Sequence, residues 1–349
     1  MVEKRYNFLK GARPSAVSQK YSGKLGTMSK HIILNTLDLT NCPQAIKDLE
    51  AVGRVIHADP KLCAVKDILP EVTAYLASAS LIVDRDFLSV ARKLRVIGSP
   101  STGTDHLDLD AINARGIAVF DISKEYDLLS KFTATSELAF GLLLAVIRNI
   151  PLGREKVLHG EWEREKLKGF QLAGKTIGII GVGRLGSITA KIAHGFDMQI
   201  LGFDPFKKGN ELVEYVEIDV LLKSSDVVFI HVHLNSDTVR LVGKSEFELM
   251  KPSSIIVNTS RGKIIDEDAL LDALENEKIA GAALDVIDGE WLSREKLLEH
   301  KLVNYAQHSN NLLIVPHIGG STDESIILAR NFMAKKVSDY LKSAEIGAL

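Results

Sequence analysis

The chain has 349 residues, a formal net charge of −2, 46% hydrophobic residues and 25% charged residues. These values are ordinary for a globular protein of two domains, and the neutral balance argues against a nucleic-acid partner, which usually requires a strongly basic face. The apolar runs, of about ten residues, are too short to cross a membrane, which takes about twenty. Two cysteines, Cys42 and Cys63, predict free thiols in a reducing, cytoplasmic compartment and no cysteine-built metal site.

Residues 1–30 differ from the rest of the chain. They carry seven Lys and Arg residues against the single acid Glu3, and they show no apolar period. We expect a disordered basic tail, or an extension upstream of a start at Met28. A transit peptide is an alternative, because such segments are also basic and acid-poor, but only two of the seven basic residues are arginine.

From residue 31 onward, short β-branched runs alternate with helical segments. The first series predicts strands at 31–35, 54–57, 80–83, 94–98 and 116–120, with helices at 43–52, 86–93 and 107–115 between them. Strands that alternate with helices are connected by right-handed crossovers and form a parallel sheet with both faces covered. This half of the chain is therefore predicted to be an α/β domain.

A second series of the same kind begins near residue 174. Its predicted strands are 176–180, 198–203, 226–230, 254–257, 280–286 and 312–315. In the segment that joins the two series, the helix at 137–149 is apolar nearly all round, so we expect it to be buried on every side, within the domain or against another subunit. The final helix at 325–341 is amphipathic and could pack back on the first domain.

A glycine-rich turn follows the first strand of the second series. Gly181 permits a tight turn, Gly183 lets the backbone approach a pyrophosphate, and Gly186 lets the next helix pack close to the strand. Asp204, at the end of the next strand, can accept hydrogen bonds from both ribose hydroxyls, which favours NAD; Lys207 and Lys208 leave acceptance of NADP open. A lone GxGxxG pattern is weak, and a structural turn or a methyltransferase-type nucleotide site remains an alternative.

Five stretches lie in a fixed order along the chain, and one of them contains this turn. They are 101–108 (STGTDHLD), 172–186, 250–262 ending in NTSRG, 281–286 (GAALDV) and 316–322 (PHIGGST). With them the sequence resembles the D-isomer-specific 2-hydroxyacid dehydrogenase family, from about residue 31 to 341. The resemblance implies a Rossmann-type NAD-binding domain at 128–317, inserted in a flavodoxin-like substrate domain at 31–127 plus 318–349.

The resemblance also implies the catalytic set Arg261, Glu290 and His317. The planar guanidinium of Arg261 suits a planar 2-keto acid and stabilises the charge that develops on the C2 oxygen. His317 exchanges a proton with that oxygen, and the Glu290 carboxylate stabilises the imidazolium and orients its ring. Taken alone, each of these residues is more often an ordinary surface or strand-end polar group.

Other positions follow from the same resemblance. Ser101, Thr102 and Gly103 are expected to hold the substrate carboxylate through backbone N–H groups and to face the cofactor across an interdomain cleft. The expected cofactor contacts are Gly181, Gly183, Arg184, Leu185, Gly186, Asp204, Thr259, Asp285 and Gly320, with Asp285 by the nicotinamide amide. The histidines expected to be merely structural are His31, His57, His159, His194, His300 and His308.

Two departures from the family pattern concern the substrate. Trp291 stands where the family usually has a proline after the catalytic glutamate, and it either shapes the substrate pocket or merely packs there. The arginine-rich stretch that meets the phosphate in phosphoglycerate dehydrogenases is here 83–86 (VDRD), with one arginine between two acids. Phosphoglycerate is therefore disfavoured as a substrate.

The sequence predicts an oxidoreductase that transfers a hydride between NAD(H) and a small 2-keto or D-2-hydroxy acid. It predicts a homodimer with no metal, nucleic-acid or membrane partner. An NAD-sensing corepressor-like protein without turnover is the alternative, although the complete Arg, Glu and His set argues against a loss of chemistry.

Overall fold

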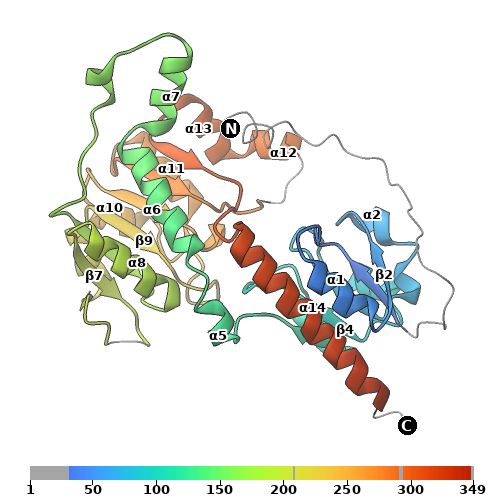
Figure 1. Cartoon of the computed structure of the whole chain (residues 1–349). Coiled ribbons are helices and arrows are strands. Elements are labelled where there is room, and N and C mark those ends of the chain that lie inside the picture. The colour runs from blue at the N-terminus through green and yellow to red at the C-terminus, as the bar shows by residue number, and fades with distance from the viewer. Residues whose placement is uncertain (1–30, 207–208, 291–293, 347–349) are drawn as a thin grey trace, which may run out of the picture.

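The computed structural model describes residues 31–206, 209–290 and 294–346. The predicted basic tail at residues 1–30 and the position of Trp291 lie outside the described residues. Within them the chain forms two parallel sheets flanked by helices, and these appear as two separate lobes in Figure 1. The predicted fold class, two βα domains of which one is of the Rossmann type, is confirmed.

The first sheet has five strands in the order β2-β1-β3-β4-β5, the order of flavodoxin-like folds. The strands are β1 (Ile32–Asn35), β2 (Arg54–His57), β3 (Ala74–Leu76), β4 (Val96–Gly98) and β5 (Ala118–Phe120). Its helices are α1 (Pro43–Glu50), α2 (Leu62–Val65), α3 (Arg85–Val90) and α4 (Leu109–Ala114). Aspartates begin α3 and α4: the side chains of Asp84 and Asp108 accept the N–H groups of Phe87 and Ala111.

The predicted strand at 80–83 is wrong. The third strand is Ala74–Leu76, and Val83 makes only an isolated parallel bridge to Leu107. The β-branched run at 81–83 looked the more strand-like by local propensity, but Ile82 is 62% exposed, whereas every residue of β3 is buried. Burial between the two neighbouring strands, rather than propensity, selects the strand here.

The second sheet has seven strands in the order β12-β11-β10-β9-β6-β7-β8, which is the Rossmann order extended by one strand. The strands are β6 (Thr176–Ile180), β7 (Gln199–Phe203), β8 (Glu214–Tyr215), β9 (Val227–Ile230), β10 (Ile255–Asn258), β11 (Gly281–Leu284) and β12 (Leu312–Ile314). Strands β9, β10 and β11 are buried at every residue, as expected when helices cover both faces of a parallel sheet.

The remaining helices cover this second sheet, project from its lobe or lie in the connections between the two lobes. They are α5 (Tyr126–Leu129), α6 (Ala134–Ile147), α7 (Ile150–Leu158), α8 (Arg184–Gly195), α9 (Ile218–Ser224), α10 (Lys244–Leu249), α11 (Glu267–Glu275), α12 (Arg294–Glu299), α13 (Lys301–His308) and α14 (Asp323–Ile346). Short 3₁₀ turns lie at Leu69–Glu71, Arg164–Leu167 and Gly262–Ile264.

The last helix returns to the first lobe, as its amphipathic pattern indicated. In Figure 1, α14 runs along the blue and teal lobe although it lies at the opposite end of the chain. Met333 and Val337 of α14 are fully buried against Gly98 of β4. Asn331 accepts the Ala45 N–H of α1, and the Ser338 hydroxyl donates to the Asp48 carbonyl oxygen. Because the chain leaves the first lobe after β5 and re-enters it through α14, two crossings join the lobes.

The apolar helix predicted at 137–149 is α6, and it is buried on one side only. Leu142, Leu143 and Ile147 pack in the core under the second sheet, but Glu137 and Gly141 are exposed. Burial on every side within the chain is therefore not observed, which leaves the predicted alternative of a contact with another subunit. By length and composition alone, the segment Tyr126–Ile147 could cross a membrane. This is only weak evidence for a membrane span, because the core helix of a globular protein passes the same test. Helix α5 moreover ends at Leu129, before α6 begins.

Candidate active site

The glycine loop connects β6 to α8 at the carboxyl edge of the second sheet. Gly181 has a φ of 91°, and a Cβ there would lie 2.6 Å from the His231 carbonyl oxygen. A Cβ on Gly186 would lie 2.1 Å from the Gly181 carbonyl oxygen, so the helix packs directly on the turn. A Cβ on Gly183, by contrast, would meet no atom within 4 Å. The loop is thus closed on the protein side and open at the position where a pyrophosphate would approach the helix N-terminus.

Asp204 lies at the end of β7 beside this loop. Its Oδ2 accepts the Val182 N–H at 3.0 Å and its Oδ1 accepts the Phe206 N–H at 2.9 Å. The carboxylate is therefore tied to the glycine loop itself, next to the position expected for a ribose. Across the loop edge, the Oγ1 of Thr259 is buried with no hydrogen-bond partner among the described residues. An orphaned hydroxyl and an open glycine suit the binding of an extended polar cofactor at this edge.

Arg184 and Leu185 begin α8, but their polar contacts lead toward the segment that joins the lobes. The Arg184 guanidinium is half-buried, and its Nη1 donates to the carbonyl oxygens of Leu129 at 3.1 Å and Phe132 at 2.5 Å. Burial lowers the pKa of this guanidinium. The Leu185 carbonyl oxygen accepts the Ser136 hydroxyl. The Arg184 side chain thus contacts the linker, and its N–H is the group that remains for the expected cofactor contact.

Arg261 lies in the turn that follows β10. Asn258 is 1% exposed; its Nδ2 donates to the Arg261 carbonyl oxygen and its Oδ1 accepts the Ser260 N–H, both at 2.9 Å. The Ser260 hydroxyl donates to the Ile230 carbonyl oxygen of the neighbouring strand. These bonds explain why the NTSRG stretch has this composition: the small polar residues satisfy one another and leave the arginine projecting from the sheet edge.

The guanidinium of Arg261 reaches the other lobe. Its Nε donates to Oδ2 of Asp105 at 2.8 Å, and a Cβ on Gly103 would lie 1.6 Å from its Nη2. Gly103 therefore has to be glycine for the arginine to lie against the 101–103 loop. Burial raises the pKa of Asp105, but the hydrogen bond and charge of Arg261 outweigh that effect and hold the pKa below its usual value. The structure thus brings Arg261 to the predicted Ser101, Thr102 and Gly103 loop.

His317 and Glu290 meet at the same sheet edge. Nδ1 of His317 lies 2.6 Å from Oε1 of Glu290, with the two side chains 31% and 20% exposed. Because an ionised carboxylate only accepts hydrogen bonds, Nδ1 carries the hydrogen of this contact. The pair joins residues that are 27 apart in the chain, and it matches the predicted partnership of the two side chains.

The turn that carries His317 is held by Asp285. Ile318 and Gly319 donate their N–H groups to the two carboxylate oxygens of Asp285, at 2.7 and 2.8 Å. His317 itself has a φ of 53°, a left-handed conformation that is uncommon for a residue with a side chain. Asp285 is 1% exposed, and burial raises its pKa against the effect of these two N–H groups. Its evident task is to fix the strained turn, and its contact with a nicotinamide stays a prediction.

Comparisons with known proteins agree with this geometry. A sequence model described as "D-isomer specific 2-hydroxyacid dehydrogenase, NAD binding domain" matches residues 140–319. The glyoxylate reductase of Thermococcus litoralis is 37% identical over 297 residues, which cover 81% of this chain and 84% of that protein. The chain belongs to the D-isomer-specific 2-hydroxyacid dehydrogenase family.

Two further relatives extend the comparison. The D-3-phosphoglycerate dehydrogenase of Methanocaldococcus jannaschii is 36% identical over 310 residues, 85% of this chain and 55% of that protein. The chain therefore spans about half the length of the phosphoglycerate dehydrogenase that it matches. The structure of D-lactate dehydrogenase from Aquifex aeolicus, complexed with NAD and lactic acid, aligns with a TM-score of 0.78 and 26% identity over 90% of this chain and 96% of that one. The predictions of the family and of NAD as cofactor are confirmed.

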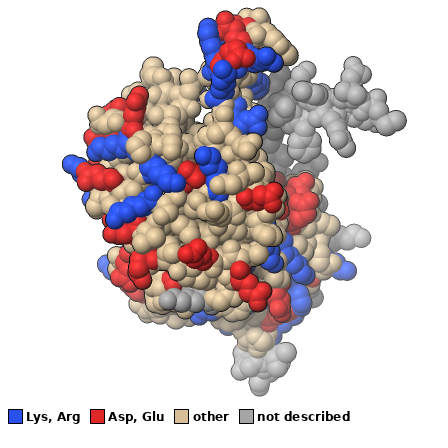
Figure 2. Space-filling view, turned by 90° about the vertical axis from the view of Figure 1, so that its left-hand side faces the viewer, with Lys and Arg blue, Asp and Glu red and all other residues tan. Residues whose placement is uncertain are grey.

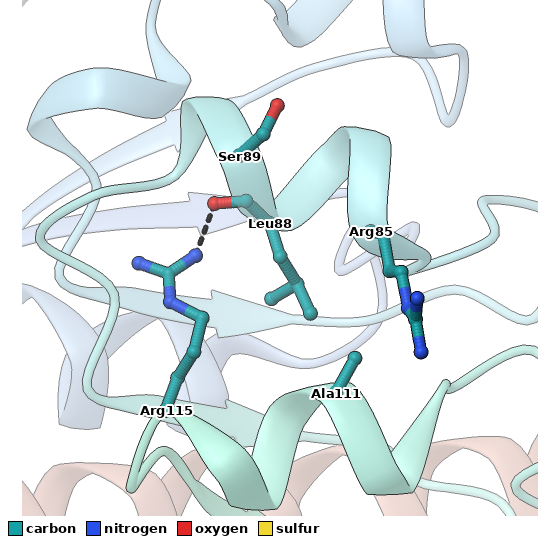
Figure 3. Close-up of a pocket in the computed structure, with 5 residues that line it drawn as sticks. All are labelled: Arg85, Leu88, Ser89, Ala111 and Arg115. Carbon is teal, nitrogen blue, oxygen red and sulfur yellow. Dashed lines mark hydrogen bonds between the residues drawn. The ribbon is translucent and has the colours of Figure 1, made fainter.

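A separate surface pocket of about 270 Å³ lies between α3 and α4. Figure 3 shows Arg85 and Arg115 on either side of Leu88 and Ala111, an arrangement that resembles an anion site. Arg115, however, donates to the carbonyl oxygens of Leu88 and Ala91 and so caps the C-terminal end of α3. This pocket is distinct from the NAD-binding edge, and we assign no ligand to it.

One residue at the site was missed by sequence reasoning. Asp105 lies within the quoted 101–108 stretch, yet its role as the partner of Arg261 had no signal in the sequence, because the two residues are 156 positions apart. The segment that follows β3, residues 77–84, contains no Lys or Arg, and the single arginine of the 83–86 stretch, Arg85, begins α3.

Proposed function

We propose that this chain catalyses reversible reduction of a small 2-keto acid to a D-2-hydroxy acid with NAD(H). The observation that carries the proposal is the pairing of His317 with Glu290 at 2.6 Å on the sheet edge that also presents Arg261 and the open glycine loop. NADH, when bound, supplies the hydride. The other requirements of the reaction are a carboxylate anchor and a proton donor, and this chain has residues suited to both.

Arg261 is the proposed carboxylate anchor. Its Nε is engaged by Asp105 and its Nη1 by the Ser260 carbonyl oxygen, so the guanidinium plane is held from two sides. A fixed guanidinium offers its remaining N–H groups to a carboxylate and a C2 oxygen without further ordering. We propose that Ser101, Thr102 and Gly103 hold the same carboxylate through backbone N–H groups from the opposite lobe, so that substrate is bound between the lobes.

His317 is the proposed acid and base. With Nδ1 held by Glu290, Nε2 is the nitrogen that gives a proton to the C2 oxygen in reduction and takes it back in oxidation. Glu290 acts through His317, since its carboxylate stabilises the imidazolium and fixes the ring. Asp285 supports the same ring indirectly through the turn at Ile318 and Gly319.

For the cofactor, we propose contacts from Gly181, Gly183 and Gly186 to the pyrophosphate, aided by the N–H groups of Arg184 and Leu185. Asp204 would take the ribose hydroxyls, which favours NAD over NADP because the carboxylate repels a 2′-phosphate. The orphaned Thr259 hydroxyl, together with Asp285 and Gly320, would lie toward the nicotinamide. The proposed domain division is 128–317 for the NAD-binding domain and 31–127 plus 318–349 for the substrate domain.

We also propose that the chain works as a homodimer formed through α6, α7 and the residues that follow. Several large apolar side chains are exposed there: Ile150 55%, Val157 52%, Leu158 67% and Trp162 85%. The segment projects from the NAD-binding lobe in Figure 1, and the top of the molecule in Figure 2 carries charges of both signs. Exposed apolar residues gathered on one projecting segment are typical of subunit contacts.

The test is NADH oxidation by the purified chain across a panel of 2-keto acids, from glyoxylate, pyruvate and hydroxypyruvate to branched acids and phosphohydroxypyruvate. Turnover of an unphosphorylated member is the expected result, and the preferred member reports the size that the site accepts. NADH binding without turnover of any member would reject the proposal and favour a cofactor-sensing role.

A further inference from the structure

A second buried pair of an imidazole and a carboxylate lies behind the loop that carries Glu290. Glu267 is the first residue of α11, and His300 immediately precedes α13. Nε2 of His300 lies 3.3 Å from Oε2 of Glu267, and each side chain is only 10% exposed. Burial raises the pKa of Glu267, partly offset by the Asp288 N–H and by His300. A buried polar pair of this kind is a poor source of stability.

Both side chains hold the same residue of the backbone. Oε1 of Glu267 accepts the Asp288 N–H at 2.8 Å, and Nε2 of His300 lies 3.2 Å from the Asp288 carbonyl oxygen. Because a carbonyl oxygen and an ionised carboxylate only accept, Nε2 of His300 carries the hydrogen. Its Nδ1 is buried without a hydrogen-bond partner in the described parts of the chain. Asp288 is thus held at its N–H and at its C=O by two different elements.

The position of Asp288 determines where Glu290 lies. Only Gly289 separates them, and its φ of 73° makes the sharp turn between the two residues. On the other side, a Cβ on Gly262 would lie 2.1 Å from the Ile287 carbonyl carbon and 2.3 Å from the Asp288 nitrogen. The 287–288 peptide therefore lies directly on the residue that follows Arg261. The 287–288 peptide thus packs beside Arg261 at one end and leads to Glu290, the partner of His317, at the other.

We infer that Glu267 and His300 are positioning residues, which hold the Asp288 backbone from both ends and so place Glu290 against His317. The inference rests on the proposed function, because it assigns the two residues to the same chemistry. It also revises the expectation that His300 is merely structural. An adjacent contact provides the contrast: Lys301 and Asp268 join the same two helices one residue further along, but they are 36% and 81% exposed and touch no catalytic loop.

The experiment compares His300→Gln with His300→Asn. A glutamine amide can reach the place of Nε2 and donate to Asp288, whereas the shorter asparagine cannot, and both are polar residues of similar character. We expect His300→Asn to lower kcat about tenfold to a hundredfold, as misplacement of a catalytic group does, with NADH affinity close to wild type. Its Tm should fall, because the buried Glu267 carboxylate loses its partner, so kcat is measured well below the Tm of each variant. His300→Gln should restore most of the turnover, and Lys301→Ala should leave it unchanged. Equal kcat for the two His300 variants would overturn the inference.

Amide hydrogen exchange of the 286–290 peptide supplies a readout that needs no turnover. Exchange should be faster in His300→Asn and in Glu267→Ala than in His300→Gln, Lys301→Ala or wild type. If wild type reduces no 2-keto acid, the proposed function has failed, and exchange alone decides on the positioning role. Unchanged exchange in His300→Asn and Glu267→Ala, in protein that still binds NADH, would show that the two side chains do not hold Asp288.

Discussion

Nε of Arg261 donates to Asp105 across the two lobes at 2.8 Å, although the residues come from different sheets. Asp105 is itself 54% exposed at its side chain, and Arg261 only 28%. The contact therefore lies at the edge of the proposed substrate site. There Asp105 orients the Arg261 guanidinium, which in our proposal also binds the substrate carboxylate. An exposed ion pair contributes little to stability, so its value is in orientation.

We expect Asp105→Asn to raise the KM for the 2-keto acid about tenfold, because loss of the aspartate charge weakens one of the two contacts that hold the guanidinium, and the substrate then has to order it. NADH affinity should not change, since the cofactor edge lies on the other sheet. Steady-state kinetics at saturating NADH make the measurement. Asp86→Asn, at an exposed acid on α3, is the control, and an unaltered KM in Asp105→Asn would refute the aiming role.

Removal of the proposed acid and base should affect the chemical step alone. His317→Gln is expected to lower kcat by about 10² to 10⁴, the usual contribution of a positioned acid or base. Fluorescence titration with NADH should give the wild-type affinity, because the imidazole lies at the substrate end of the site. Undiminished turnover in this variant would remove His317 from the mechanism.

The glycine loop offers a test of the cofactor site with a matched control. A Cβ on Gly183 or on Gly195 meets no atom within 4 Å, so Gly183→Ala and Gly195→Ala are both tolerated sterically. Only the first methyl would occupy the space proposed for the pyrophosphate. We expect Gly183→Ala to weaken NADH binding about tenfold with no loss of Tm, and Gly195→Ala to leave binding unchanged. The same affinity in both variants would place the pyrophosphate elsewhere.

His231 predicts a loss of stability in acid. Its ring is stacked with Phe229, Nε2 contacts the Thr189 hydroxyl at 2.8 Å, and burial lowers the pKa to about 4. The folded state keeps this ring neutral while the unfolded chain protonates it near 6.5, so stability is full above that pH and falls as the pH drops toward about 4. The stability lost once the ring is protonated in both states is on the order of 3 kcal/mol.

Urea denaturation at pH 7 and at pH 4.5 measures this effect. His231→Gln, which keeps a hydrogen-bonding group for Thr189, should lose less free energy of unfolding between the two pH values than wild type. His194→Asn, at an exposed position on α8, should behave as wild type does. An identical pH dependence in His231→Gln and wild type would mean that other groups cause the acid loss.

Features that depend on near neighbours in the chain could be predicted from the amino-acid sequence. The glycine turn after a buried β-strand, the small polar NTSRG turn and the alternation of strands with helices each depend on residues that are close neighbours, so their patterns predicted two parallel sheets, the NAD-binding edge and the family. The family resemblance of short motifs predicted the positions of Asp285, Glu290 and His317.

The neighbours of each element, by contrast, followed from the packing of the folded chain. The run at 80–83 has strand propensity, yet β3 formed at Ala74–Leu76 because that segment is the one buried between β1 and β4. Helix α6 is apolar nearly all round, but one sheet can cover only one of its faces. Arg261 with Asp105, and Glu267 and His300 with Asp288, are contacts between distant segments that no local pattern encodes. They arise because the packing of the two sheets brings distant segments of the chain together, which is a property of the whole fold.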